Sequence, residues 1–217
     1  NLALTMIGGS LLWVGWFGFN AGSNLEANGT AVLAMVNTVV ATAAAALAWM
    51  FVEWLIRGKP SMLGIISGAV SGLVAVTPAA GFSGPMGAIV LGAVAGAACL
   101  WGVTVMKRWI GYDDSLDVFG VHGIGGVIGA LGTGVVASPA LGGTGVFDYA
   151  SGAVAEFNIV SQVMNQAWGV GVAIVWSAIV SFVLFKLIDV TIGLRVNSEQ
   201  EREGLDTVTH GERAYNI

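Results

Sequence analysis

Long apolar runs alternate with short polar interruptions along the whole chain. A transmembrane helix needs about 20 mostly apolar residues, because the hydrocarbon core of a bilayer is about 30 Å thick. The sequence contains six runs of this kind before a polar tail. The runs cover residues 2–21, 31–56, 62–79, 86–106, 118–137 and 159–193, and the tail covers residues 194–217. The pattern therefore predicts an all-α polytopic membrane protein with six spans.

The last run differs from the others in length. A helix over 159–193 would be about 50 Å long at ~1.5 Å per residue, so it must tilt or project beyond the bilayer. The charged tail that follows has two interpretations: a disordered segment, or a short solvated helix over the acidic stretch "EQERE" that Gly204 would end. His210 lies in the same polar region, so we interpret it as a surface residue and not as a ligand.

Composition supports the membrane assignment. Hydrophobic residues make up 56% of the chain, charged residues 10%, and mean hydropathy is +0.83. A soluble domain usually carries about 25% charged residues. The net charge of -5 without a basic stripe excludes a nucleic-acid binder. The single cysteine, Cys99, is interpreted as a small packing residue.

The chain begins "NLALTM", without an initiator methionine or a charged leader. No signal peptide is visible in that stretch, so we expect the beginning of the protein to lie elsewhere.

Lysine and arginine follow only every second apolar run. With alternating spans, all eight basic residues fall on one side of the membrane: Arg57, Lys59, Lys107, Arg108, Lys186, Arg195, Arg202 and Arg213. Loops with an excess of Lys and Arg stay in the cytoplasm. The sequence therefore predicts a cytoplasmic C-terminus in an inner or plasma membrane, with the start of the first run also cytoplasmic.

Small residues recur at helical spacing in three of the runs. Glycines recur every fourth residue in the third run and again in the fourth run, and every third residue in the fifth. These glycines are Gly64, Gly68 and Gly72, then Gly92 and Gly96, then Gly120, Gly123, Gly126, Gly129 and Gly132. Such spacing lets helix backbones approach closely in a membrane. The stretch "GIGGVIG" is not a dinucleotide loop, because no strand precedes it and no ribose-binding acid follows.

One histidine, His122, lies inside an apolar run. Polar groups in a membrane span are costly and usually face the bundle interior or a cavity. On a regular helix His122 shares a face with Val118 and with Gly125, Gly126 and Gly129, so its ring should lie beside a bare glycine surface. A neutral imidazole can donate and accept a hydrogen bond, which suits a pore for a small polar molecule. The alternative is a packed histidine bonded to a neighbouring helix.

An aromatic cluster closes the first run in "GWFGFNAGS". Trp16, Phe19 and Ser23 share a helical stripe with Leu12. Aromatic faces attract a compact cation by about 0.5–2 kcal/mol each, and the serine hydroxyl adds an acceptor. The alternative is an interfacial aromatic belt, which is common at this depth.

The remaining charges have structural interpretations. Glu53 is expected to pair with Arg57, and Asp189 with Lys186. Asp117 is expected to cap the helix that carries His122, with a capping role also open for Asp113 and Asp114, which precede it. No nucleophile with a base and no paired carboxylates are present, so we do not expect an enzyme. A lone histidine cannot complete a metal shell, and no cofactor is expected.

Several stretches together resemble the ammonium transporter (Amt/Rh) family. They are "WFGFNAGS", "NTVVATAAAAL", "SGLVAVTPAAG", "LWGV", "DVFGVHG" and the tail "GLRV…EQEREGLD…HGE.AY". The resemblance covers essentially the whole chain and concerns the second half of such a protein. It implies an eleven-helix fold in which two five-helix halves form an inverted repeat around a pore. This chain would be the second half plus the long final helix, in a homotrimer with one pore per subunit.

The resemblance also implies roles for individual residues. Phe19 would belong to an external aromatic gate, Ser23 to an ammonium recruitment site above it, and His122 to a pair of pore histidines. Trp16 lies in the same motif without an implied ligand role. Ammonium would be recruited as a cation and ammonia conducted, and the tail would dock a PII-type signalling protein.

The first five spans of the family pattern are missing, and with them the partner histidine. We expect this chain alone not to transport, since half an inverted repeat cannot close a pore. Either the chain is a fragment of a longer one, or a second chain supplies the rest. Three alternatives remain open: an ammonium sensor of the same fold, a channel for water or carbon dioxide, and a purely structural subunit.

Overall fold

The computed structural model describes residues 1–213, so the last four residues of the expected tail lie outside it. The chain divides into two compact units, residues 1–170 and residues 171–217. Within the described residues, six helical segments are long and apolar enough to cross a membrane. The prediction of an all-α membrane protein with six spans is confirmed.

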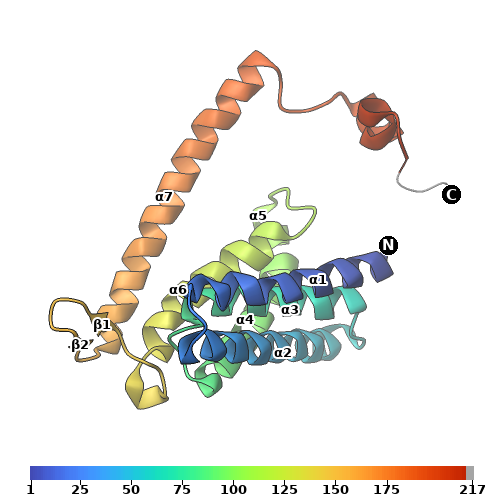
Figure 1. Cartoon of the computed structure of the whole chain (residues 1–217). Helices are drawn as coiled ribbons and strands as arrows, with labels where there is room; N and C mark the ends of the chain where they lie inside the picture. The colour runs from blue at the N-terminus through green and yellow to red at the C-terminus, as the bar shows by residue number, and fades with distance from the viewer. Residues whose placement is uncertain (214–217) are drawn as a thin grey trace. The chain divides into compact units, whose positions relative to one another are not determined.

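The first unit is built from helices α1 to α6 and the first part of α7 (Figure 1). Helix α2 packs against both α3 and α4, while α6 packs against α3 and α4 and α1 lies along α3. Two turns of this unit are π-helical: η3 continues α4, and η4 precedes α6 and contains His122. The bounds are α1 (Leu2–Asn20), α2 (Gly29–Arg57), α3 (Met62–Val76), α4 (Pro85–Trp101), η3 (Gly102–Met106), α5 (Lys107–Ile110), η4 (Phe119–Gly123), α6 (Ile124–Val136) and α7 (Ile159–Thr191).

Local sequence explains where α2 begins and ends. The Asn28 side chain accepts hydrogen bonds from the N–H groups of Thr30 and Ala31 at 2.9 and 3.2 Å, so α2 begins at Gly29 and not at the expected residue 31. Asparagine is among the best N-cap residues, because its side-chain oxygen satisfies N–H groups that the first turn leaves free. Gly58 ends the helix in a left-handed conformation with φ 74°.

Glycines of α3 and α4 bring both helices close to α2. We call Gly68, Gly72, Gly92 and Gly96 the glycine seam. A methyl group added to Gly92 would lie 2.1 Å from the Ala41 carbonyl oxygen, and one added to Gly68 would lie 2.9 Å from the Ala45 carbonyl oxygen. Backbones can approach this closely only where side chains are absent, as the glycine spacing predicts.

Two buried polar side chains also hold this region together. Asn37 on α2 donates hydrogen bonds to the carbonyl oxygens of Ala80 and Ser83 at 2.8 and 2.7 Å. Glu53, 2% exposed, pairs with Arg57 at 3.0 Å and also accepts from the N–H of Ser61, which caps α3. The predicted Glu53–Arg57 pair is confirmed, and the structure adds a link between α2 and α3.

The connection between α6 and α7 contains a small two-stranded ladder. Strand β1 (Phe147–Asp148) pairs antiparallel with β2 (Ala153–Val154). The hydrophobic pattern did not predict it, because strands of two residues carry no periodicity that can be read.

Helix α7 (Ile159–Thr191) has 33 residues and buries none of them within the described chain. The expected Lys186–Asp189 pair is present at 3.8 Å. After it, the short helix α8 (Ser198–Glu203) carries a capping box of Asn197 and Gln200 and ends before Gly204, which has φ 104°. The predicted solvated helix and its end at Gly204 are confirmed. His210 is exposed, as expected.

Candidate functional site

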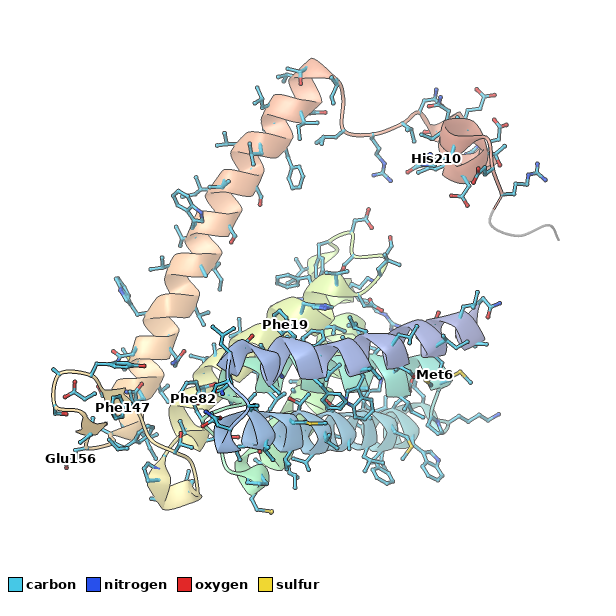
Figure 2. The ribbon with its side chains drawn as sticks, viewed as in Figure 1. Met6, Phe19, Phe82, Phe147, Glu156 and His210 are labelled. Carbon is cyan, nitrogen blue, oxygen red and sulfur yellow. The ribbon has the colours of Figure 1, made fainter. Side chains whose placement is uncertain are left out.

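The aromatic end of α1 forms a shallow cavity of about 310 Å³, lined by Leu12, Gly15, Trp16 and Phe19. The Trp16 and Phe19 rings meet edge to face, with centroids 5.5 Å apart. Trp16 Nε1 donates to Thr77 Oγ1 at 2.8 Å, so a polar bond to α3's C-terminal end fixes the indole. Phe19 remains 60% exposed. Figure 2 labels this residue on α1. A ligand at the C-terminal end of α1 would therefore meet two rings: that of Trp16, which a hydrogen bond fixes, and that of Phe19, which is exposed.

Ser23 lies just beyond this cavity in the short turn η1 (Gly22–Asn24). Its hydroxyl donates to the Phe19 carbonyl oxygen at 2.5 Å, and the side chain is exposed. Because the proton is used in this bond, the hydroxyl oxygen is left as an acceptor. That is the property a cation such as ammonium requires.

His122 lines a separate cavity of about 360 Å³ between α1, α3 and the loop before η4. Thr5 and Gly9 contribute from α1, and Ser67 and Val70 from α3. The imidazole is exposed and forms no hydrogen bond to another described residue. Both ring nitrogens are therefore available to a molecule in this cavity.

The structure confirms only part of the helical face that we expected His122 to share with Val118 and three glycines. A methyl group at Gly125 would touch Val74 at 3.4 Å, and one at Gly129 would lie 2.3 Å from the Ala75 carbonyl oxygen. These two glycines therefore pack against α3 and are not a bare surface, while Gly126 has nothing within 4 Å. Val118 is 52% exposed and is not among the residues that line the histidine cavity. The π-helical turn between Val118 and α6 explains this difference, because i→i+5 bonding departs from the 3.6-residue register.

The expected cap at Asp117 is wrong, and Asp114 performs that role. The Asp114 carboxylate accepts from the N–H groups of Val118, Phe119 and Gly120 at 2.8, 3.0 and 3.2 Å. Asp117 has a left-handed backbone, with φ 56°, and its carboxylate pairs with Lys107 Nζ at 2.7 Å. The loop folds back so that the residue four positions before the helix reaches its free N–H groups, which are the groups that need an acceptor.

The described residues do not bring Phe19 and His122 into one cavity. The aromatic cavity uses the C-terminal half of α1, and the histidine cavity uses its N-terminal half. The two candidate sites therefore follow one another along the same helix. Among the described residues no group of three or more His, Cys, Asp or Glu side chains could hold a metal ion.

Sequence reasoning missed two residues at these sites: Thr77, which bonds to Trp16, and Lys107, which bonds to Asp117. It named Asp114 only as one of several possible caps. The only local signal for Asp114 was its place in "YDDSLD", which does not distinguish the three aspartates. Thr77 lies 61 residues from Trp16 and Lys107 lies 10 residues from Asp117, so no helical spacing could identify either contact.

Comparison with known proteins gives a consistent result. A model described as "Ammonium Transporter Family" matches residues 1–215. The chain is 50% identical to an ammonium transporter of Aquifex aeolicus over 217 residues, which cover 100% of this chain and 49% of that protein. It is 45% identical to an ammonium transporter of Bacillus subtilis over 218 residues, which cover 99% of this chain and 52% of that protein. The chain thus spans about half the length of these relatives.

Solved structures show the same likeness in three dimensions. A protein described as "Sensor Amt Protein" matches with a TM-score of 0.86 and 29% identity, over 96% of this chain and 49% of that one. Mep2 of Saccharomyces cerevisiae matches with a TM-score of 0.81 and 30% identity, over 92% of this chain and 44% of that one. The six-span arrangement therefore corresponds to about half of each of these membrane proteins.

Proposed function

The chain belongs to the ammonium transporter family, and from this premise we propose that it forms one half of a passage for ammonium or ammonia. It is a multi-pass membrane protein with six membrane-length helices. In the proposed route, ammonium is recruited at the aromatic end of α1 and ammonia is conducted past His122. The observation that carries the proposal is His122 itself, which lines a cavity between membrane helices with both ring nitrogens unbonded among the described residues.

Recruitment rests on the chemistry of Phe19, Trp16 and Ser23. A compact cation gains about 0.5–2 kcal/mol from an aromatic face, and more when water is excluded. The Thr77 bond to Trp16 pre-orients one ring, so less ordering is needed when the cation binds. The Ser23 oxygen supplies an acceptor for an ammonium N–H.

The proposed conduction depends on the ability of a neutral imidazole both to donate and to accept a hydrogen bond. One ring nitrogen accepts and the other donates, so the ring can hydrogen-bond ammonia without adding a fixed charge to an apolar passage. A bare ion in the same apolar surroundings would lose its hydration at a high cost. A proton left behind by ammonium can be passed along ring nitrogens. Val118 is kept as a more peripheral candidate at the mouth of this route.

Further assignments follow from the same premise. We propose that the passage is completed by a second half that carries another histidine, in a homotrimer in an inner or plasma membrane. We place the C-terminus in the cytoplasm, where the tail would dock a PII-type signalling protein. The eight basic residues lie near or after the ends of alternate spans, which supports this orientation.

A second candidate function is that of an ammonium sensor. It is favoured by the likeness to the protein described as "Sensor Amt Protein". A sensor would bind ammonium at the same aromatic site but show little flux. Binding and flux therefore have to be measured separately.

The test of the proposed recruitment site is Phe19→Ala, in the protein at its full natural length in proteoliposomes. We expect the preference for ammonium over potassium to fall several-fold while thermal stability stays within about 0.5 kcal/mol, because Phe19 is largely exposed. Phe82→Ala, at another half-exposed phenylalanine, is the matched control. Unchanged selectivity in Phe19→Ala would contradict the recruitment role, and ammonium binding without flux in the unmodified protein would favour the sensor.

A further inference from the structure

Two irregular helical turns meet next to the histidine cavity. The π-helical turns η3 and η4 lie against each other through glycines. A methyl group at Gly120 would lie 3.2 Å from the Val103 nitrogen, and one at Gly102 would lie 3.4 Å from the Gly120 carbonyl oxygen. Single π-helical turns are rare and occur frequently at functional sites. The π-helical turn η4, which carries His122, therefore packs against a second π-helical turn, η3, at the end of the preceding span.

Lys107 joins these two turns through the loop between them. It begins α5 directly after η3, and its Nζ donates to Asp117 Oδ1 at 2.7 Å and to the Asp114 carbonyl oxygen. Asp117 has φ 56°, a left-handed conformation that costs energy for any residue with a Cβ. Such a conformation persists only where its surroundings hold it. The Asp117 N–H donates to the Asp114 carbonyl oxygen at 3.1 Å, and Lys107 bonds both to that carbonyl oxygen and to the Asp117 carboxylate.

The contacts made by Asp117 and Asp114 lead directly to the histidine turn. The Asp117 carbonyl oxygen accepts from the Val121 N–H at 2.9 Å, and Val121 is the residue before His122. Asp114 caps the same turn through three N–H groups. Asp117 also lines the histidine cavity. A shift of the loop would therefore move both the first bonds of η4 and the ring that η4 carries.

A third contact supports the same loop. The Tyr112 ring packs edge to face on Phe119, with centroids 5.4 Å apart. Burial raises the pKa of the Tyr112 hydroxyl, and the Asp114 carboxylate adds to this effect. This contact is made to Phe119, the first residue of η4, so it supports the same end of the turn as Lys107 does.

We propose that Lys107 is a positioning residue for His122, acting through the left-handed Asp117 that it holds in place. Lys107 contributes through its two hydrogen bonds and does not contact the transported molecule. The importance of His122 for flux rests on the proposed function, but the effect of Lys107 on the orientation of the imidazole does not.

The test uses the protein at its full natural length in lipid nanodiscs, with ¹⁵N-labelled histidine. The ring resonances of His122 are identified by their loss in His122→Gln. Lys107→Met should displace these resonances and lower ammonium flux about tenfold, since small displacements of an oriented group have effects of at least that size. Lys107→Arg keeps the charge and should recover most of both. Arg108→Met, one residue further along α5, removes the same charge without touching Asp117 and should change neither.

A second variant separates positioning from simple loss of stability. Glycine adopts φ near 56° without strain, so Asp117→Gly should make the lysine unnecessary. The double variant Lys107→Met with Asp117→Gly should fold and show the same His122 resonances as Asp117→Gly alone, because Asp117 itself lines the histidine cavity. Unmoved resonances in Lys107→Met, or a double variant that unfolds or whose resonances differ from those of Asp117→Gly, would overturn the proposal. Absence of ammonium flux in the unmodified protein would instead overturn the proposed function and leave the spectroscopic test intact.

Discussion

The first unit has a packed region at the glycine seam and an open region around Phe19 and His122. Glycine occurs in both, but it allows close helix contact in the first and faces open space in the second. At the glycine seam, Gly92 and Gly96 let α4 touch the backbone of α2, and no space remains for even a methyl group. On the other side, Gly126 faces open space, and Phe19 and His122 present their rings without burial. Glycine spacing alone therefore does not distinguish a packing surface from a passage.

The polar side chains show the same contrast. Asn37 and Glu53 are buried in the packed region, and each bonds to a neighbouring segment. His122 has no such bond among the described residues. His122 is exposed within the described residues, so its unbonded ring nitrogens are accessible to a molecule that is not part of the fold.

The largest expected effect is at the glycine seam. Gly92→Ala would place a methyl group 2.1 Å from the Ala41 carbonyl oxygen, so α2 and α4 would have to separate. We expect a loss of about 3 kcal/mol in the free energy of unfolding, the upper range for overpacking. The measurement is thermal or denaturant unfolding in detergent. Gly126→Ala is the matched control and should be neutral or slightly stabilising; equal losses in the two variants would show that the two sides do not differ.

A smaller effect is expected from the buried amide. Asn37→Ala removes the donor to the carbonyl oxygens of Ala80 and Ser83, which leaves two acceptors unpaired. We expect a loss of about 2 kcal/mol, as for a buried hydrogen-bonding group whose partner is removed. Asn165→Ala, at an exposed position of α7, should stay within about 0.5 kcal/mol in the same unfolding measurement. A loss of less than about 0.5 kcal/mol in Asn37→Ala would mean that water takes over the hydrogen bonds of the Asn37 amide to the two carbonyl oxygens.

The smallest effect is expected in the exposed loop that contains β1 and β2. Hydrogen bonds from the Ser151 side chain, and then from the Ala150 N–H, hold the pKa of Asp148 below its ordinary value. A lowered folded pKa means that the stabilising contribution is fully present above the ordinary carboxyl value of about 4. It is lost as pH falls through the lower folded value. Amide exchange at Ala150 should accelerate only in that acid range.

The control for this prediction is Ser151→Ala, which removes the first of these donors. The midpoint of the Asp148 titration, followed by carboxyl NMR, should rise toward the ordinary value. A midpoint that does not move would assign the lowered pKa to the backbone alone.

Properties that depend on local sequence could be predicted, and properties that depend on loop geometry could not. Apolar length gave the six spans, and the spacing of Gly92 and Gly96 gave a close helix contact, because both are set within one helix. The choice of Asp117 as the cap failed because three aspartates precede the helix and only the folded loop selects Asp114. No sequence pattern predicts the π-helical turn at His122. The sequence therefore could not show that Val118 and His122 do not line the same cavity.

The central claim is that His122 serves a passage and not the packing of helices. The most direct measurement is ammonium-dependent current or flux in proteoliposomes for the protein at full natural length, compared with His122→Ala, with unfolding measured on the same preparations. The account predicts that flux or its selectivity for ammonium changes at least tenfold while stability changes by less than about 1 kcal/mol, because the ring is exposed and unbonded within the described residues. Unchanged flux together with a large loss of stability would contradict it.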